Sequence, residues 1–253
     1  ESLFTLNIDG VIAKGKENPE LIWKFIEGNT SKSAAFSILT ITSIWLHEAP
    51  EELLLAIELH NHVCPGLISG LLILKYLESR DFLTPNSKYY VVASPVWCKD
   101  DLFVQLLDAT PGKRRIMIKL LPRDVEDKLR KSLGADAAGI FIVMSPEKLG
   151  KAYVVTFNWS KACELANIKR SMFKGKYWWW SRLVMNLELL KYLDKPEELV
   201  KVVKVVEFKG YVGRYPTLFY NMSLVGTNPY EVVELIKTIE TSACLLYTSD
   251  AAD

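Results

Sequence analysis

The sequence predicts an α+β protein in which helices pack on a mixed β-sheet. Segments with helical and strand-like patterns follow one another along the chain, but their order is not a strict strand–helix–strand alternation. Hydrophobic residues make up 49% and charged residues 24% of the 253 residues, which is ordinary globular composition. This length fits one large domain, or one domain with extensions.

The first fifty residues predict a hairpin, a helix and one ambiguous segment. Residues 1–14 read as two short strands that turn at Asp9 and Gly10, because Asp-Gly is a frequent hairpin turn. A helix is expected over 19–26, since proline favours the first helical turn. Residues 34–46 are apolar and β-branched, so their period does not separate a buried strand from a buried helix.

Two helices then flank a polar segment. Pro50 followed by two glutamates opens the first, because proline and acidic side chains both favour a helix start. Pro65 opens a longer helix that runs to Arg80. From residue 89 onwards, the expected strands are 89–93, 115–121, 138–144, 152–157 and 202–208, and the expected helices are 100–107, 124–133, 179–190 and 230–239.

The charge balance argues against two classes of partner. Lys and Arg total 31 and Asp and Glu total 30, which gives a net charge of +1. A chain without a basic excess is not expected to bind nucleic acid or anionic membranes in general. The longest apolar run, 34–46, is too short and too polar to span a bilayer. No membrane span and no nucleic-acid partner are therefore predicted.

The cysteines and the two ends bear on the cellular compartment. The chain opens with Glu1 rather than Met. Whether a signal peptide or anchor precedes Glu1 is therefore left open. Residues 244–253 read like a translated sequencing adapter and are set aside. The remaining Cys64, Cys98 and Cys163 cannot form a disulfide framework. Free or metal-bound thiols in the reducing cytoplasm are the expected state.

The segment with the most chemical information is His60, His62 and Cys64. The chain has three histidines, and two of them lie here beside a cysteine. Imidazole and thiolate together suit zinc, with nickel or iron as alternatives. In an extended segment all three side chains share one face, and in a helix His60 and Cys64 do. A start of the next helix at Pro65 would also favour the thiolate of Cys64. The competing interpretation is a polar turn with two exposed histidines and a buried thiol.

Two later segments carry further candidates. Cys98 ends a strand region, and Asp100 and Asp101 follow at a helix start, where acidic side chains are often only dipole partners. Cys98 becomes a candidate metal ligand if the fold brings it to Cys64. Lys113 follows a tight turn and could bind a carboxylate or phosphate, although a solvated basic turn is an equal alternative.

These residues resemble a known family. The segment His60-Asn-His-Val-Cys-Pro-Gly66, then Cys98-x-x-Asp101, then Thr110-x-Gly112-Lys113 is similar to the FmdE family of formylmethanofuran dehydrogenase proteins. That family's pattern is His-Gly-His-x-Cys-Pro-Gly, then Cys-x-x-Asp, then Gly-Cys-Thr-x-Gly-Lys. The resemblance covers roughly residues 50–165. Asn61 replaces the family's first glycine, and Asp108 and Ala109 replace its later Gly-Cys.

The resemblance implies an α+β fold similar to the catalytic domain of glyceraldehyde-phosphate dehydrogenase, a homodimer, and a metal or thiol cluster near the first motif. It also implies association with the other components of formylmethanofuran dehydrogenase, the oxidoreductase that reduces carbon dioxide onto methanofuran in methanogenesis. The expected domain bounds are 1–49 for an N-terminal extension, 50–167 for the FmdE-like domain, 168–243 for a C-terminal extension and 244–253 for the adapter-like tail.

Three functional hypotheses remain open. In the first, His60, His62 and Cys64 hold a metal, with Cys98 as fourth ligand, in a component of formylmethanofuran dehydrogenase, and Asp101 orients a ligand. Cys64, Asp101 and Lys113 are its candidate catalytic residues. The second hypothesis is a metal carrier or sensor without catalysis. The third is a thiol enzyme in which Cys64 or Cys98 is the nucleophile and His60 or His62 the base.

Overall fold

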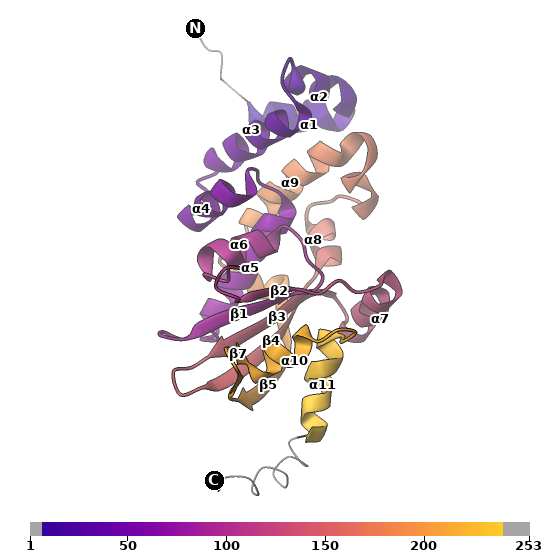
Figure 1. The fold of residues 1–253 in the computed structure, drawn as a ribbon. Coiled ribbons are helices and arrows are strands. Elements are labelled where there is room, and N and C mark those ends of the chain that lie inside the picture. Colours follow the sequence, from indigo (N-terminus) through magenta and orange to yellow (C-terminus); the bar gives the residue numbers. More distant parts are fainter. Residues whose placement is uncertain (1–6, 240–253) are drawn as a thin grey trace, which may run out of the picture. The chain divides into compact units, whose positions relative to one another are not determined.

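The fold is described from a computed structural model and covers residues 7–239. The start of the predicted hairpin (residues 1–6) and the adapter-like tail (244–253) lie outside these residues. The described chain combines helices with a mixed five-stranded sheet, so the predicted α+β class is confirmed (Figure 1). Residues 7–79, 97–107 and 157–201 form one compact unit, the helical unit. Residues 80–96, 108–156 and 202–239 form a second, the sheet unit.

The helical unit is built around a buried helix. α5 contacts α4, α6 and α9, and α4 also packs on α6. Ten of the fifteen residues of α5 are buried, as expected for a helix that is apolar on nearly all sides. The helices of this unit are α1 (Ile8–Glu17), α2 (Pro19–Glu27), α3 (Lys32–Trp45), α4 (Glu51–His60), α5 (Pro65–Ser79), α6 (Lys99–Leu106), α8 (Trp159–Leu165) and α9 (Trp178–Leu190), with 3-10 turns at Arg170–Phe173, Gly175–Tyr177 and Pro196–Glu198.

The sheet unit holds strands in the order β2-β1-β3-β4-β5. β1 runs parallel to β2 and antiparallel to β3, so that Val91 pairs with Ile116 on one side and Phe141 on the other. The elements are β1 (Lys88–Ala93), β2 (Ile116–Ile118), α7 (Arg123–Leu133), β3 (Asp136–Met144), β4 (Leu149–Phe157), β5 (Val200–Lys209), β6 (Tyr211–Val212), β7 (Tyr215–Pro216), α10 (Thr217–Ser223) and α11 (Pro229–Ile239).

Alternate strand residues form the core of the sheet unit. Tyr90 and Val92 of β1 and Ile140 and Ile142 of β3 are buried in one hydrophobic cluster, as the strand period of two requires. Buried residues of α10 and α11 complete this cluster, and Phe219 lies 5.3 Å from Tyr90 between ring centroids. The two C-terminal helices therefore cover one face of the sheet (Figure 1).

The hairpin predicted for residues 1–14 is wrong, because α1 occupies Ile8–Glu17. The Asn7 side chain accepts a hydrogen bond from the Gly10 N–H at 2.8 Å and caps the helix. Asp9 lies in the first turn, where a negative charge is favourable. The Asp-Gly pair is therefore the start of a helix rather than a hairpin turn.

The other expected elements are found, and several bounds differ by one or a few residues. The ambiguous segment 34–46 is helical and belongs to α3, whose start is capped by the Ser31 hydroxyl. Helices α8 and α10 and strands β6 and β7 were not predicted. Within residues 7–239, no helix combines the length and hydropathy that crossing a bilayer requires. The four domain bounds stay predictions.

Candidate metal centre

The loop between α4 and α5 carries His60, His62 and Cys64. α4 ends at His60, and Asn61 follows in the left-handed conformation with φ 63° and ψ 3°. Asparagine tolerates this region better than most residues with a side chain, and glycine tolerates it best. Asn61 therefore preserves the turn that a glycine would make. The Cys64 carbonyl accepts the Leu67 N–H at 3.0 Å, so Cys64 stands at the start of α5.

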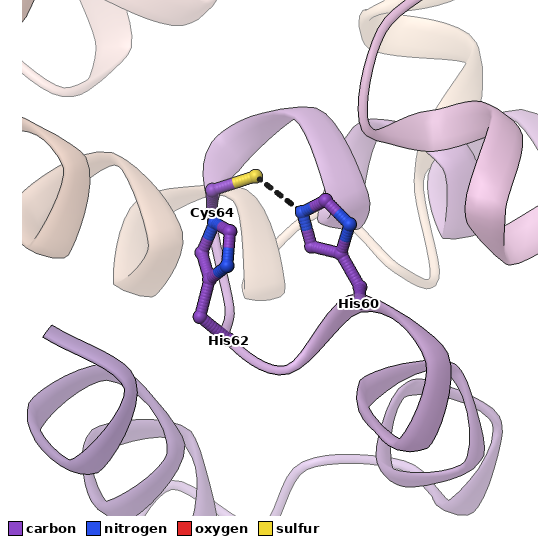
Figure 2. Close-up of side chains that lie close together, drawn as sticks. All are labelled: His60, His62 and Cys64. Atoms are coloured by element: carbon purple, nitrogen blue, oxygen red, sulfur yellow. Dashed lines mark hydrogen bonds between the residues drawn. The ribbon is translucent and has the colours of Figure 1, made fainter. Parts of the chain in front are cut away.

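This turn brings the three side chains together (Figure 2). Their ligand atoms all lie within 4.8 Å of one another. The Nε2 atom of His60 lies 3.6 Å from the Cys64 Sγ, and the two imidazole centroids are 4.3 Å apart. Both histidines are half-buried and Cys64 is buried, so the arrangement is a partly enclosed cluster rather than a turn with exposed histidines.

Asp101, from α6, contacts the cluster directly. Its Oδ2 lies 2.7 Å from the Nδ1 of His60. An ionised carboxylate only accepts, so the Nδ1–H of a neutral His60 donates to it, and the lone pair of Nε2 faces Cys64. A carboxylate in this position fixes the tautomer and the ring orientation of a histidine ligand. The contact places Asp101 beside His60, and the function of Asp101 stays a prediction.

Cys98 stands at the start of α6, beside the cluster. It falls outside the group of three, but its thiol is hydrogen-bonded to Cys64 and to His60. A Cβ atom added to Gly66 would lie 3.5 Å from the Cys98 Sγ and 3.6 Å from the Cys64 Sγ, and only 3.0 Å from the Cys98 Cβ. Gly66 therefore allows the starts of α5 and α6 to approach each other closely.

The two thiols have opposite pKa shifts. The hydrogen bond from Cys64 is the main cause that lowers the pKa of Cys98 to about 4, and His60 adds to the effect against the opposing influence of burial. The same hydrogen bond, followed by burial, raises the pKa of Cys64 well above its ordinary value. The backbone N–H groups at the start of α5 lower that pKa, as the sequence predicted, but they are outweighed. In the metal-free protein the thiolate is therefore on Cys98.

The two histidines also differ. Burial lowers the pKa of His60, but hydrogen bonds with Cys98 and Asp101 outweigh it, and the net pKa is raised above 6.5. Burial lowers the pKa of His62, and the charge of His60 lowers it further. The paired His60 is therefore the first of the two to take up a proton as the pH falls.

The backbone of this loop is hydrogen-bonded by two buried side chains. Neither was identified from the sequence. The Thr40 hydroxyl of α3 accepts the Val63 N–H at 3.1 Å, and the Asn186 amide of α9 donates to the Val63 carbonyl at 3.0 Å. Both side chains are fully buried. Val63 lies between His62 and Cys64, so these contacts fix the backbone that carries two candidate ligands. A polar residue within an otherwise apolar helical run was the available signal.

Replacing Thr40 with valine is expected to weaken zinc binding about tenfold, because positioning contacts typically contribute 10–100-fold in affinity. It should also lower the free energy of unfolding by about 1–3 kcal/mol, since the Val63 N–H stays buried without its acceptor. Competition with a chromophoric chelator and urea unfolding measure the two effects. Thr30→Val is the matched control, because the Thr30 hydroxyl bonds an exposed carbonyl. Equal effects of the two variants would contradict the assignment.

A buried ion pair follows Cys98 in the sequence. Lys99 is fully buried, and its Nζ lies 2.7 Å from both carboxylate oxygens of Asp100. The same ammonium group lies 4.5 Å from the ring centroid of Trp97. Asp100 also accepts the Trp97 N–H at 2.9 Å. Asp100 is therefore more than a dipole partner of the helix, because it compensates a buried charge.

Lys113 belongs to the sheet unit. Its Nζ lies 2.5 Å from the Oδ1 of Asp108, and Arg115 contacts the other oxygen of that carboxylate at 3.0 Å. The side chains of Lys113 and Asp108 are about half exposed. This contact is a surface ion pair, and the predicted ligand-binding function of Lys113 stays a prediction.

Fold and cluster together define an α+β protein with a candidate His/Cys metal centre. Residues 59–187, just over half of the chain, match the family model described as FmdE, Molybdenum formylmethanofuran dehydrogenase operon. The chain therefore belongs to the FmdE family, as its motifs predicted. The matched segment contains all four candidate ligands. No curated protein matches the chain.

Proposed function

We propose that this protein binds a divalent metal, zinc before nickel or iron, as an accessory or subunit of formylmethanofuran dehydrogenase in the one-carbon metabolism of methanogenesis. The observation that carries the proposal is the convergence of His60, His62 and Cys64 within 4.8 Å in a chain of the FmdE family. Two imidazoles with one or two thiolates form a donor set that zinc prefers in proteins.

The donor set fits a metal, and each residue has a distinct contribution. His60 would bind through Nε2, because its Nδ1–H is engaged by Asp101. His62 and Cys64 would supply the next two donors, and the Cys98 thiolate, which interacts with Cys64 and His60, is the candidate for the fourth. A bound zinc ion supplies Lewis acidity at this point. With Cys98 bound the site is closed and structural, whereas an unbound Cys98 leaves a position for chemistry.

Elemental analysis of the purified protein tests the proposal. We expect about one zinc, nickel or iron per chain, as for a mononuclear site, and loss of this metal in the His62→Ala, Cys64→Ala double variant. The matched control is His47→Ala, Cys163→Ala, which removes the same residue types outside the cluster. Absence of metal from the unaltered protein, or equal loss in both variants, would overturn the proposal.

A second candidate function, a thiol enzyme, is favoured by one arrangement. Cys98 has a pKa lowered to about 4, chiefly by the hydrogen bond from Cys64, and it also contacts His60, which is held by Asp101. A cysteine, a base and an orienting carboxylate are the components of nucleophilic thiol catalysis. We infer that this function requires Cys98 to react with iodoacetamide at pH 6 in the protein as purified. Protection of Cys98 until the metal is chelated would favour the metal centre instead.

We also propose that the protein is cytoplasmic and forms a homodimer. The free cysteines Cys64, Cys98 and Cys163 support a reducing compartment, and the dimer follows from the family resemblance. A metal carrier or sensor is the remaining alternative. It differs in exchanging its metal readily with chelators, whereas a structural or catalytic centre should retain its metal during dialysis.

A further inference from the structure

Cys64 and Cys98 are two thiols in direct contact. They stand at the starts of α5 and α6, and their side chains are hydrogen-bonded to each other. A Cβ atom added to Gly66 would lie 3.6 Å from the Cys64 Sγ and 3.5 Å from the Cys98 Sγ, so both sulfurs border the same small space. A disulfide forms only between cysteines whose backbones already lie close together. The packing of the two helix starts therefore meets the first requirement for a disulfide.

A cleft of about 400 Å³ exposes this pair to small molecules. Cys64 and Cys98 line it, together with Cys163 from α8, and all of its lining residues belong to the helical unit. Cys64 is only 5% exposed, whereas Cys98 is partly exposed. An oxidant as small as hydrogen peroxide that enters the cleft therefore reaches the Cys98 sulfur more readily than the Cys64 sulfur.

We propose that Cys64 and Cys98 form a site of reversible oxidation, at which a peroxide converts the two thiols to a disulfide and a thiol reductant restores them. Disulfides in a reducing compartment are typically transient and serve catalysis or redox sensing. The disulfide itself does not depend on the proposed function. Its effect on the metal does rest on that function, because the oxidised sulfurs are no longer the thiolates that bind a metal.

The reaction balances with hydrogen peroxide as the oxidant. The Cys98 sulfur attacks one peroxide oxygen as the thiolate, the O–O bond breaks, and the departing hydroxide takes up the thiol proton and leaves as water. The Cys64 sulfur then attacks the sulfur of the resulting sulfenic acid. The S–O bond breaks, the S–S bond forms, and a second water leaves with the Cys64 proton. The two electrons lost by the sulfurs reduce the peroxide to water.

Peptide mapping of the full chain after treatment with hydrogen peroxide tests the site. The protein is first stripped of metal with a chelator, and the thiols that remain after oxidation are blocked with iodoacetamide. We expect the Cys64–Cys98 disulfide to form at least about tenfold faster than any pairing with Cys163, because contacting thiols react at a high effective concentration. Dithiothreitol should restore both thiols. A dominant pairing with Cys163, or oxidation of Cys98 to the sulfinic acid without a disulfide, would overturn the proposal.

Two glycine variants test whether the packing of the helix starts drives the pairing. In Gly66→Ala the new Cβ would lie 3.0 Å from the Cys98 Cβ, which is closer than an ordinary contact between carbon atoms. Cys98 must move away, and disulfide formation should slow about tenfold. Gly112→Ala is the matched control, because its Cβ would meet no atom within 4 Å, and it should change the rate less than about twofold. Equal rates in the two variants would overturn the inference.

Zinc loading separates this inference from the proposed function. Peroxide should release the zinc to a chromophoric chelator, and dithiothreitol should restore zinc binding, in the unaltered protein and in Cys163→Ser alike. A Cys64–Cys98 disulfide in a protein that never held metal would support the oxidation site and overturn the metal proposal. A full complement of zinc, with no disulfide formed after the zinc is removed, would overturn the oxidation site alone. Zinc that stays bound to the disulfide form would overturn the effect on the metal.

Discussion

Replacing Lys99 with methionine is expected to lower the free energy of unfolding by about 3–5 kcal/mol, which is typical of breaking a buried ion pair from one side. The methionine side chain fills most of the space, so the loss is mainly electrostatic. Asp100 would stay buried, with its charge no longer compensated by the ammonium group 2.7 Å away. Urea unfolding of the zinc-loaded protein, with fixed zinc concentration, measures the effect.

Two further variants make this prediction specific. In the double variant Lys99→Met, Asp100→Asn, the amide keeps an acceptor for the Trp97 N–H without a buried charge. It should recover more than half of the loss, because an isolated buried charge is the main penalty. Lys75→Met breaks a pair with Glu52 whose side chains are about one-third exposed. It should change stability by about 1 kcal/mol or less. Equal effects of Lys99→Met and Lys75→Met would contradict the argument.

The buried pair also bears on the position of Cys98. Lys99 follows Cys98 directly, and a Cβ atom added to Gly70 of α5 would lie 3.0–3.1 Å from the backbone and Cβ of Lys99. The start of α6, which contains both members of the ion pair, therefore packs closely against the glycines of α5. A variant that loosens Lys99 is expected to reduce zinc affinity as well as stability.

The local sequence pattern was sufficient to predict most helices and strands. It failed where a contact of one side chain determines which of two structures forms. Asp9-Gly10 fits a hairpin turn and a first helical turn equally well, and the cap from Asn7 selects the helix. The run 34–46 had no decisive period, and helix α3 is stabilised by packing against α9. Such choices depend on contacts between segments distant in sequence, which a local pattern does not contain.

The candidate metal centre, too, could be predicted only in part from the local sequence. Three ligands within five residues are visible in the sequence, because a short segment limits how far apart they can be. The approach of Cys98 and Asp101 depends on α6 packing against α4 and α5, and the sequence could indicate it only through family resemblance. The Thr40 and Asn186 contacts with Val63 had no motif, because any fold could have buried those two polar side chains elsewhere.

Lowering the pH from 7.5 to 5.5 is expected to weaken zinc binding by at least about 100-fold, because metal ligands must lose their protons. Cys64 has a pKa raised well above 9, chiefly by its hydrogen bond with Cys98. It must therefore release one proton throughout this range, which weakens affinity about tenfold per pH unit. Cys98, with a pKa of about 4, is already a thiolate and releases none.

His60 makes the pH dependence of zinc binding steeper at the acidic end of this range. Its pKa is raised above 6.5 by hydrogen bonds that outweigh burial, so below that raised pKa zinc must displace a second proton. The slope of log Kd against pH should then approach about two instead of one. Chelator competition across this pH range measures the slope, and a slope near zero above pH 7 would contradict a bound Cys64.

The metal-free protein should show the opposite sign of pH dependence for the His60 contribution. A folded-state pKa raised above 6.5 means that the contribution of His60 to stability is fully present below the unfolded pKa and is lost as the pH rises through the folded one. Zinc binding instead strengthens as the pH rises.

Cys98 has the opposite dependence to His60, because its pKa is lowered to about 4 and its contribution to stability is lost as the pH falls. Comparing urea unfolding of the unaltered protein and a His60→Ala variant, both without zinc, therefore isolates the His60 contribution. The difference in unfolding free energy between the two proteins should shrink as the pH rises, and a difference that grows with pH would contradict the raised pKa.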